Sequence, residues 1–182
     1  MMFPVENKMS GASNWSITVA ENELILMKLL WIRKIIDSEP RVLLHGNFDS
    51  STINPGSDTL TKWSYIWGQA IESVYLFHTK RMLMMDERIV APGLLDLQNE
   101  LSANQKDFSA WLNEQTPVAG EEPSLTNNLE KAWQQGLRLI ISLPWEEEVA
   151  QKYNSETLIL SNSIRTNSSK YQETLNTFSQ SI

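Results

Sequence analysis

A broad apolar stripe over residues 59–85 constrains the fold of this chain more than any other feature. Its apolar side chains recur every three or four positions, the spacing of one α-helix face, and alternation at every second position fits poorly. A helix with so wide an apolar face has to pack against other elements. The stripe consists of Leu60, Trp63, Ile66, Trp67, Ala70, Ile71, Val74 and Phe77, with His78 at its end.

The same spacing predicts several further helices. One of them is apolar on nearly all sides, which is typical of a central helix, and it ends before Pro40 because the residue ahead of a proline avoids the helical conformation. Another is expected to begin at Pro144 with three glutamates in its first turn, where carboxylates complement the exposed N–H groups. The expected segments are 21–37, 93–115 as one bent or two abutting helices, 124–142, 144–153 and about 168 to the end.

Short strands are expected near 15–19, 41–45 and 156–164, where β-branched and apolar residues cluster. Within 156–164 the spacing also fits a helix, so this segment stays open between the two structures. The fold class predicted is mostly α: an irregular multi-helix bundle with at most a few short strands. The alternative is an α+β fold.

The domain organisation expected is simple. Residues 1–14 read as a flexible leader, and 15–182 as a single helix-rich domain, since a chain of 182 residues suits one core. Turn-forming residues predict loops at 46–58 and 116–124.

Composition excludes some classes of function. The net charge of −7 argues against a nucleic acid held through its phosphates, because such binding needs clustered Lys and Arg. The absence of cysteine removes disulfides, thiolate metal sites and cysteine nucleophiles. No apolar run is long enough to span a bilayer or to act as an export signal, so we expect a soluble, cytoplasmic protein and no membrane partner.

The sequence contains few candidate catalytic residues. The chain has two histidines. His45 lies beside a loop with Asp49, Ser50 and Ser51, which supplies the residue types of a hydrolase without a recognisable arrangement. His78 ends the apolar stripe, and we interpret it as a boundary histidine whose hydrogen bonds are satisfied, since no metal-binding spacing accompanies it.

Ligand-binding motifs are equally sparse. The seven glycines form no phosphate-binding loop. Asp96 and Glu100 share a helix face, a spacing that carboxylates around a divalent cation can have, but solvent exposure is the simpler interpretation. We therefore predict no catalytic, metal-binding or cofactor-binding residue, and no cofactor.

The tryptophans differ in the surroundings that the sequence predicts for them. Five of the seven lie on apolar helix faces, where core packing is expected. Trp145 instead precedes three consecutive glutamates, and an aromatic residue beside carboxylates is typical of a surface that docks a basic partner. The candidate partner-binding residues are Trp145, Glu146, Glu147, Glu148, Glu121 and Glu122.

These patterns favour a non-catalytic, acidic, helical protein-binding module. Such a module would act as an inhibitor or neutraliser of a more basic protein, or as a subunit of a larger assembly. One alternative is a small-molecule sensor with a pocket between the aromatic-rich helices. The other is a hydrolase-like enzyme that uses His45.

Overall fold

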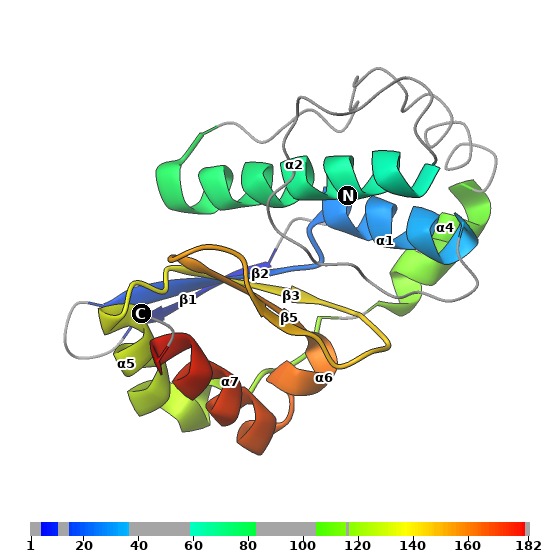
Figure 1. Ribbon diagram of the computed structural model, residues 1–182. Coiled ribbons are helices and arrows are strands. Elements are labelled where there is room, and N and C mark those ends of the chain that lie inside the picture. The colour runs from blue at the N-terminus through cyan, green and yellow to red at the C-terminus, as the bar shows by residue number, and fades with distance from the viewer. Residues whose placement is uncertain (1–4, 11–14, 37–58, 83–104, 116, 181–182) are drawn as a thin grey trace. The chain divides into compact units, whose positions relative to one another are not determined.

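The computed structural model describes residues 5–10, 15–36, 59–82, 105–115 and 117–180 (Figure 1). The chain divides into two compact units, and the single domain expected over 15–182 stays a prediction. Residues 1–22 together with 116–182 make up the first, here called the sheet unit, and residues 23–115 make up the second, the helical unit. Each unit is described below by itself.

The sheet unit is built on a five-stranded mixed sheet with the strand order β1-β2-β3-β5-β4. The three inner strands run parallel, and each edge strand pairs antiparallel with its neighbour. The carboxyl ends of the three parallel strands therefore meet at one edge of the sheet. The strands are β1 (Val5–Ser10), β2 (Ser16–Glu21), β3 (Leu139–Leu143), β4 (Ala150–Lys152) and β5 (Thr157–Ser161).

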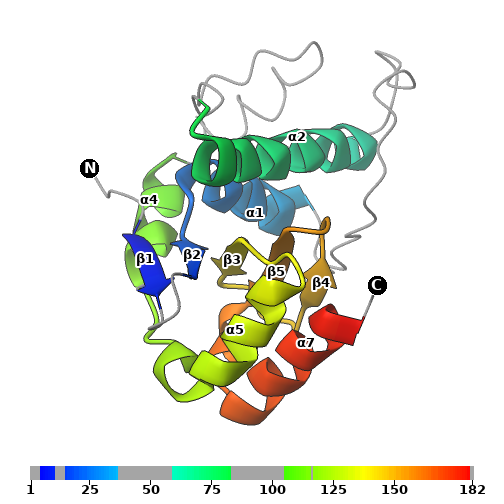
Figure 2. The same cartoon turned by 90° about the vertical axis from the view of Figure 1, so that its left-hand side faces the viewer.

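Helices cover one face of this sheet. They are the 3-10 helix η2 (Glu122–Leu125), α5 (Thr126–Gln134), α6 (Asn162–Arg165) and α7 (Ser168–Gln180). Figures 1 and 2 show α5 and α7 side by side beneath the strands. The backbone N–H of Lys170 donates to Asn167 Oδ1 at 3.1 Å, which caps α7 where the sequence predicted a helix start.

One hydrophobic core fills the space between these helices and the sheet. Alternate residues of β2 reach into it, and all five residues of β3 and of β5 are buried. The core consists of Trp15, Ile17, Val19, Leu125, Leu129, Ala132, Leu137, Ile140, Leu158, Leu160, Tyr171, Leu175 and Phe178.

The helix predicted over 124–142 is wrong in its second half. Helix α5 ends at Gln134, and Gly136 follows it with φ of 109°, a conformation that favours glycine and ends helices. The chain then enters β3. This strand is buried at every position, so it lacks the alternation that marks a half-exposed strand.

The helix predicted from Pro144 is also wrong. The N–H of Trp145 donates to the carbonyl of Leu143 at 2.9 Å, which turns the chain away from β3. Residues 146–149 form an irregular loop, and 150–152 form the short edge strand β4. The three glutamates therefore lie in a loop and not in the first turn of a helix.

The helical unit contains α1 (Leu24–Ile36), α2 (Thr59–Lys80) and α4 (Gln105–Glu114). Helix α1 packs against both of the others. On the α2 side, Trp63 stacks on Trp67 with ring centroids 5.1 Å apart and donates a hydrogen bond from Nε1 to the carbonyl of Leu29 at 2.7 Å. On the α4 side, Trp31 lies 5.5 Å from Trp111, measured between ring centroids. These contacts agree with the core role predicted for the helical tryptophans.

The fold therefore combines helices with a mixed sheet, as the α+β alternative describes, and a bundle does not describe the sheet unit. The strands expected near 15–19 and 156–164 are confirmed as β2 and β5. Residues 5–10, which the sequence placed in a flexible leader, pair with β2 as β1. The strand expected at 41–45 and the loop at 46–58 lie outside the described residues. None of the described helices has the length and apolarity needed to cross a membrane.

Candidate functional site

The candidate site is the edge of the sheet at which β2, β3 and β5 end. In sheets with parallel strands, ligands commonly bind outside the carboxyl ends of those strands. Here β2 ends at Glu21, β3 leads into the loop 144–149, and β5 leads into α6. The loop 144–149 crosses the end of β5, because β4 lies on the far side of β5 from β3. Most of the residues predicted for partner binding lie in this loop.

The loop 144–149 is anchored at both of its ends. Trp145 is 9% exposed, so the aromatic residue predicted as a surface anchor is mostly buried. At the other end, the N–H of Ser161 donates to the carbonyl of Val149 at 2.8 Å, and the N–H of Val149 donates to Ser161 Oγ at 3.2 Å. A loop held in this way loses little conformational freedom on binding.

The side chains between these anchors face solvent. Glu146, Glu147 and Glu148 are all exposed, and Glu148 forms an ion pair with Lys170 in the first turn of α7. An exposed pair of this kind contributes little to stability, with a typical value of about 0–1 kcal/mol. The three carboxylates are therefore placed at the surface of the sheet unit.

Glu121 lies close to the same part of the unit. Its backbone N–H donates to the carbonyl of Arg165 at 3.2 Å, and its half-buried carboxylate accepts a hydrogen bond from Ser124 Oγ at 3.1 Å. Arg165 ends α6, and Lys170, the partner of Glu148, follows five residues later in α7. Glu121 and Glu148 are thus bonded to residues on either side of the α6–α7 junction, Arg165 and Lys170.

Glu122 points inward, although it was predicted as a surface residue. It is 4% exposed and accepts hydrogen bonds from Arg165 Nε at 2.5 Å and from Arg165 Nη2 at 3.3 Å. The hydroxyl of Tyr171 also donates to Glu122, at 3.1 Å. On its other side, Arg165 Nη1 forms an ion pair with Glu21 at 2.6 Å. We call Glu21, Glu122, Arg165 and Tyr171 the ionic cluster.

The ionic cluster raises the pKa of two of its members, Arg165 and Tyr171. Burial opposes the charge of Arg165, but the hydrogen bond and negative charge of Glu122, followed by those of Glu21, raise the pKa of Arg165 above its ordinary value. Burial is the main cause that raises the pKa of Tyr171 well above 10, and the charge of Glu122 adds to it. Arg165 therefore stays charged and Tyr171 stays neutral throughout the physiological pH range.

Gly120 is required by the close packing around this cluster. A Cβ atom at position 120 would lie 2.5 Å from Arg165 Nε and would also overlap the carboxylate of Glu122. Both neighbours are held by the buried ion pair that they form with each other. The cluster therefore fixes the segment before η2 against the end of α6.

Hydroxyl and amide side chains complete this edge of the sheet. Ser142, at the end of β3, donates from Oγ to Asn162 Oδ1 at 2.7 Å. The hydroxyls of Ser161 and Ser163 lie 2.9 Å apart. These bonds link the ends of β3 and β5 to α6. Serine hydroxyls gathered in this way need a general base before they can act as nucleophiles, and the side chains that they are bonded to here are Asn162 and serine.

One of the two histidines lies in the described part of the helical unit. His78 Nε2 lies 2.6 Å from Glu23 Oε1, and the two side chains are 0% and 2% exposed. This arrangement agrees with the interpretation of His78 as a boundary histidine with a satisfied hydrogen bond. His45, with Asp49, Ser50 and Ser51, lies outside the described residues, as do Asp96 and Glu100. Among the described side chains, no three of His, Asp and Glu come together in a way that could hold a metal ion.

Sequence reasoning missed three members of the ionic cluster: Glu21, Arg165 and Tyr171. Glu21 could have been suspected of being buried, because it is a charged residue at the end of an apolar strand. No comparable signal exists for Arg165, which lies 43 residues from Glu122.

Comparisons with protein-family models, with curated protein sequences and with solved structures give no match to this chain.

Proposed function

We propose that this protein is a non-catalytic binding module. In this proposal the loop 144–149, called the docking loop below, docks onto a basic surface of another protein through residues 145–148. The observation that carries the proposal is the combination of exposure and anchoring in this loop. Glu146, Glu147 and Glu148 are exposed, while the residues that flank them are held by burial of Trp145 and by the backbone bonds of Val149. A preorganised row of carboxylates attracts a basic partner at a small cost in ordering.

The charge of the sheet unit supports the same proposal. Its residues include ten Asp and Glu against six Lys and Arg, a net charge of −4. Several of the basic side chains are engaged within the unit: Arg165 in the ionic cluster, Lys170 with Glu148, and Arg138 with the ring of Trp133. The unit as a whole therefore carries a net negative charge, which suits a basic protein and disfavours nucleic acid.

The residues of the proposed docking surface are Trp145, Glu146, Glu147, Glu148 and Glu121. Glu122 belongs to the ionic cluster and supports this surface from inside. Two kinds of module fit such a surface, an inhibitor or neutraliser of a basic protein and a subunit of a larger assembly. The proposal retains a cytoplasmic location, which the absence of cysteine favours.

The competing sensor function has weaker support. It places a pocket along the aromatic helix α2, but Trp63 and Trp67 are 1% and 2% exposed and stack on each other. The guanidinium of Arg33 also lies over the Trp63 ring, 5.4 Å from its centre. These contacts bury the two rings among protein atoms.

The experiment compares two double charge reversals in affinity capture from a lysate of the organism that encodes the protein, with mass spectrometry as readout. Glu146→Lys/Glu147→Lys changes the docking loop. Asp107→Lys/Glu114→Lys changes the net charge by the same amount at two exposed positions of α4. We expect a basic partner to be captured by the wild type and by the α4 variant, and to be lost from the loop variant. Equal capture by both variants, with both folded by circular dichroism, would contradict the proposal.

A further inference from the structure

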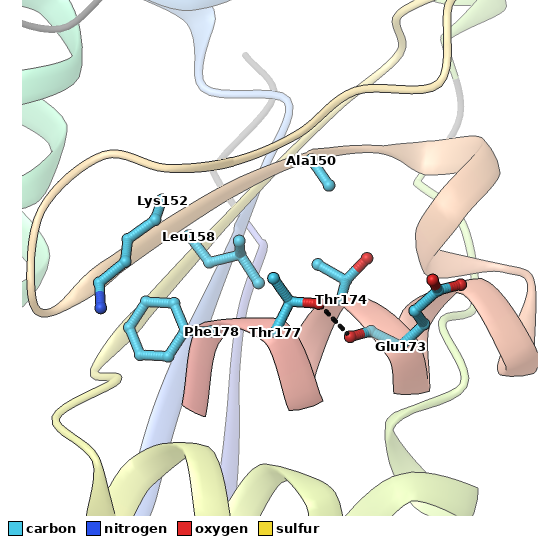
Figure 3. Close-up of a pocket in the computed structure, with 7 residues that line it drawn as sticks. All are labelled: Ala150, Lys152, Leu158, Glu173, Thr174, Thr177 and Phe178. Carbon is cyan, nitrogen blue, oxygen red and sulfur yellow. Dashed lines mark hydrogen bonds between the residues drawn. The ribbon is translucent and has the colours of Figure 1, made fainter. Parts of the chain in front are cut away.

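A small open pocket lies between the edge strand β4 and helix α7 of the sheet unit (Figure 3). Its floor is apolar and consists of Leu158 and Phe178, which both belong to the hydrophobic core. Ala150 of β4 and Thr174 of α7 form its sides. Its volume is about 210 Å³, whereas pockets that enclose drug-sized ligands have about 300–1,000 Å³. A pocket of this size suits a single apolar side chain better than a whole metabolite.

The pocket begins where the docking loop ends. On the strand side, the docking loop is followed directly by Ala150. On the helix side, Lys170 forms the ion pair with Glu148 of the docking loop, and Glu173 and Thr174 lie one turn further along the same face of α7. Both walls of the pocket therefore start at the docking loop, and the two form one continuous surface of the sheet unit.

The end of the pocket nearer to the docking loop is acidic. Glu173 is exposed there, as Glu146 and Glu147 are in the docking loop. At the far end, the ammonium of Lys152 lies over the ring of Phe178, with Nζ 4.5 Å from the ring centroid, so Lys152 is engaged within the unit. Figure 3 shows Glu173 at one end of the pocket and Lys152 with Phe178 at the other. A segment that lies along this surface meets carboxylates first and the apolar floor after them.

The length of α7 sets the spacing between these two features. A helix rises by about 1.5 Å per residue, so Phe178 lies about 12 Å along the axis from Lys170. An extended chain covers this distance in about three or four residues, at roughly 3.3 Å each. An apolar residue that reaches the floor therefore lies about three or four positions from the basic residues that meet the docking loop.

We propose that the partner of the docking loop binds through an extended basic segment that places one apolar side chain in this pocket. The segment belongs to the basic protein that the docking loop is proposed to bind, so this assignment rests on that function. Its basic residues lie against Glu146, Glu147 and Glu173, and its apolar side chain covers Leu158 and Phe178. Charge complementarity selects the basic residues, and the apolar side chain acts as the anchor that fills a pocket at the interface.

The test is an NMR titration of the ¹⁵N-labelled full chain with capped synthetic peptides. The first peptide is Lys-Lys-Ser-Gly-Leu, and the reversed sequence Leu-Gly-Ser-Lys-Lys is titrated as well, because the segment can run in either direction. We expect the tighter of the two to shift the amide resonances of Glu147 and Thr174 saturably. With serine in place of leucine, the same peptide should bind about fivefold more weakly and shift Glu147 alone, because a partly buried leucine is then lost. With glutamate in place of both lysines it should not bind.

One variant fills the pocket and a second serves as its control. Ala150→Leu places an apolar side chain in the pocket from β4. It should lower the affinity for the leucine peptide to that for the serine peptide and leave the serine peptide unchanged. Gln172→Leu adds the same side chain at an exposed position of α7 outside the pocket, and it should leave both affinities unchanged.

The outcomes separate this inference from the function on which it rests. Equal affinity of the wild type for the leucine and serine peptides, with a saturable shift at Glu147, overturns the anchor pocket and leaves the docking loop in place. No saturable shift at Glu147 with any of the basic peptides overturns both. The wild type alone decides between these results if Ala150→Leu fails to fold.

Discussion

The guanidinium of Arg165 lies 2.5 Å from the carboxylate of Glu122, and the two residues are 2% and 4% exposed. This contact joins the end of α6 to the 3-10 helix η2, and the second carboxylate, that of Glu21, joins both to the end of β2. Two carboxylates and one guanidinium share a site that water does not reach. The geometry of the carboxyl edge of the sheet therefore depends on Arg165 being present.

Replacing Arg165 by methionine tests this dependence. Arg165→Met keeps most of the side-chain volume but leaves Glu21 and Glu122 buried without a cation. Breaking a buried ion pair from one side costs about 3–5 kcal/mol of unfolding free energy. We expect a loss of this size in urea denaturation. Lys170→Met is the matched control, because Lys170 pairs with Glu148 at the surface and its loss should cost less than about 1 kcal/mol. Similar losses in both variants would contradict the structural role of the ionic cluster.

Tyr171 predicts a loss of stability at alkaline pH. Burial, together with the charge of Glu122, raises the pKa of Tyr171 above 10, so the folded protein keeps this proton when the unfolded chain releases it. The contribution to the unfolding free energy is complete below pH 10 and falls as the pH rises beyond 10. Between about pH 8 and about pH 11, ionisation of this tyrosine in the unfolded chain lowers the unfolding free energy by about 1.4 kcal/mol.

The measurement for Tyr171 is the change in unfolding free energy between about pH 8 and about pH 11, in the wild type and in Tyr171→Phe. The phenylalanine variant lacks the hydroxyl that donates to Glu122, so it is expected to be less stable at both pH values. Between these two pH values, the unfolding free energy of the variant should fall by about 1.4 kcal/mol less than that of the wild type. An identical pH dependence in the two proteins would show that Tyr171 ionises normally.

Gly120 should not tolerate alanine. The added Cβ would lie 2.5 Å from Arg165 Nε, and it displaces either the guanidinium or the Glu122 carboxylate. We expect Gly120→Ala to cost about 1–3 kcal/mol, as overpacking of a buried site commonly does. The cost should be smaller when Gly120→Ala is combined with Glu122→Ala, because the carboxylate nearest to the added Cβ is then absent. Additive effects of the two substitutions would mean that the crowding lies elsewhere.

Several elements of this fold were predictable from local pattern. Helices α1, α2 and α7 begin within three residues of the positions that apolar spacing and capping residues indicated, and β2 and β5 overlap the predicted strands. In each case the signal lies in consecutive residues: a stripe at three and four, a capping asparagine, or a β-branched run. Such signals do not depend on what the element packs against.

The strand β3 was not predictable by the same means. Leu137, Ile140 and Ile141 fit the helical spacing of α5, and full burial removes the alternation of a strand. Gly136 was the signal that should have ended the helix. Strand β4 carries no local signal at all, since its three residues are extended because they pair with β5. The ionic cluster is also out of reach, because its members come together only when the sheet forms.

The hydrogen bond between Glu23 and His78 gives a last prediction, for the helical unit. Glu23 precedes α1, and its carbonyl accepts the N–H of Met27, while His78 lies in the last turn of α2. The two buried side chains thus tie the start of one helix to the end of the other. A double-mutant cycle with Glu23→Ala and His78→Ala should give a coupling free energy of about 1–3 kcal/mol in urea denaturation. A parallel cycle with Lys80→Ala in place of His78→Ala should be additive within about 0.5 kcal/mol, because Lys80 is exposed. Additivity in the first cycle would remove this pair from the contacts that hold α1 to α2.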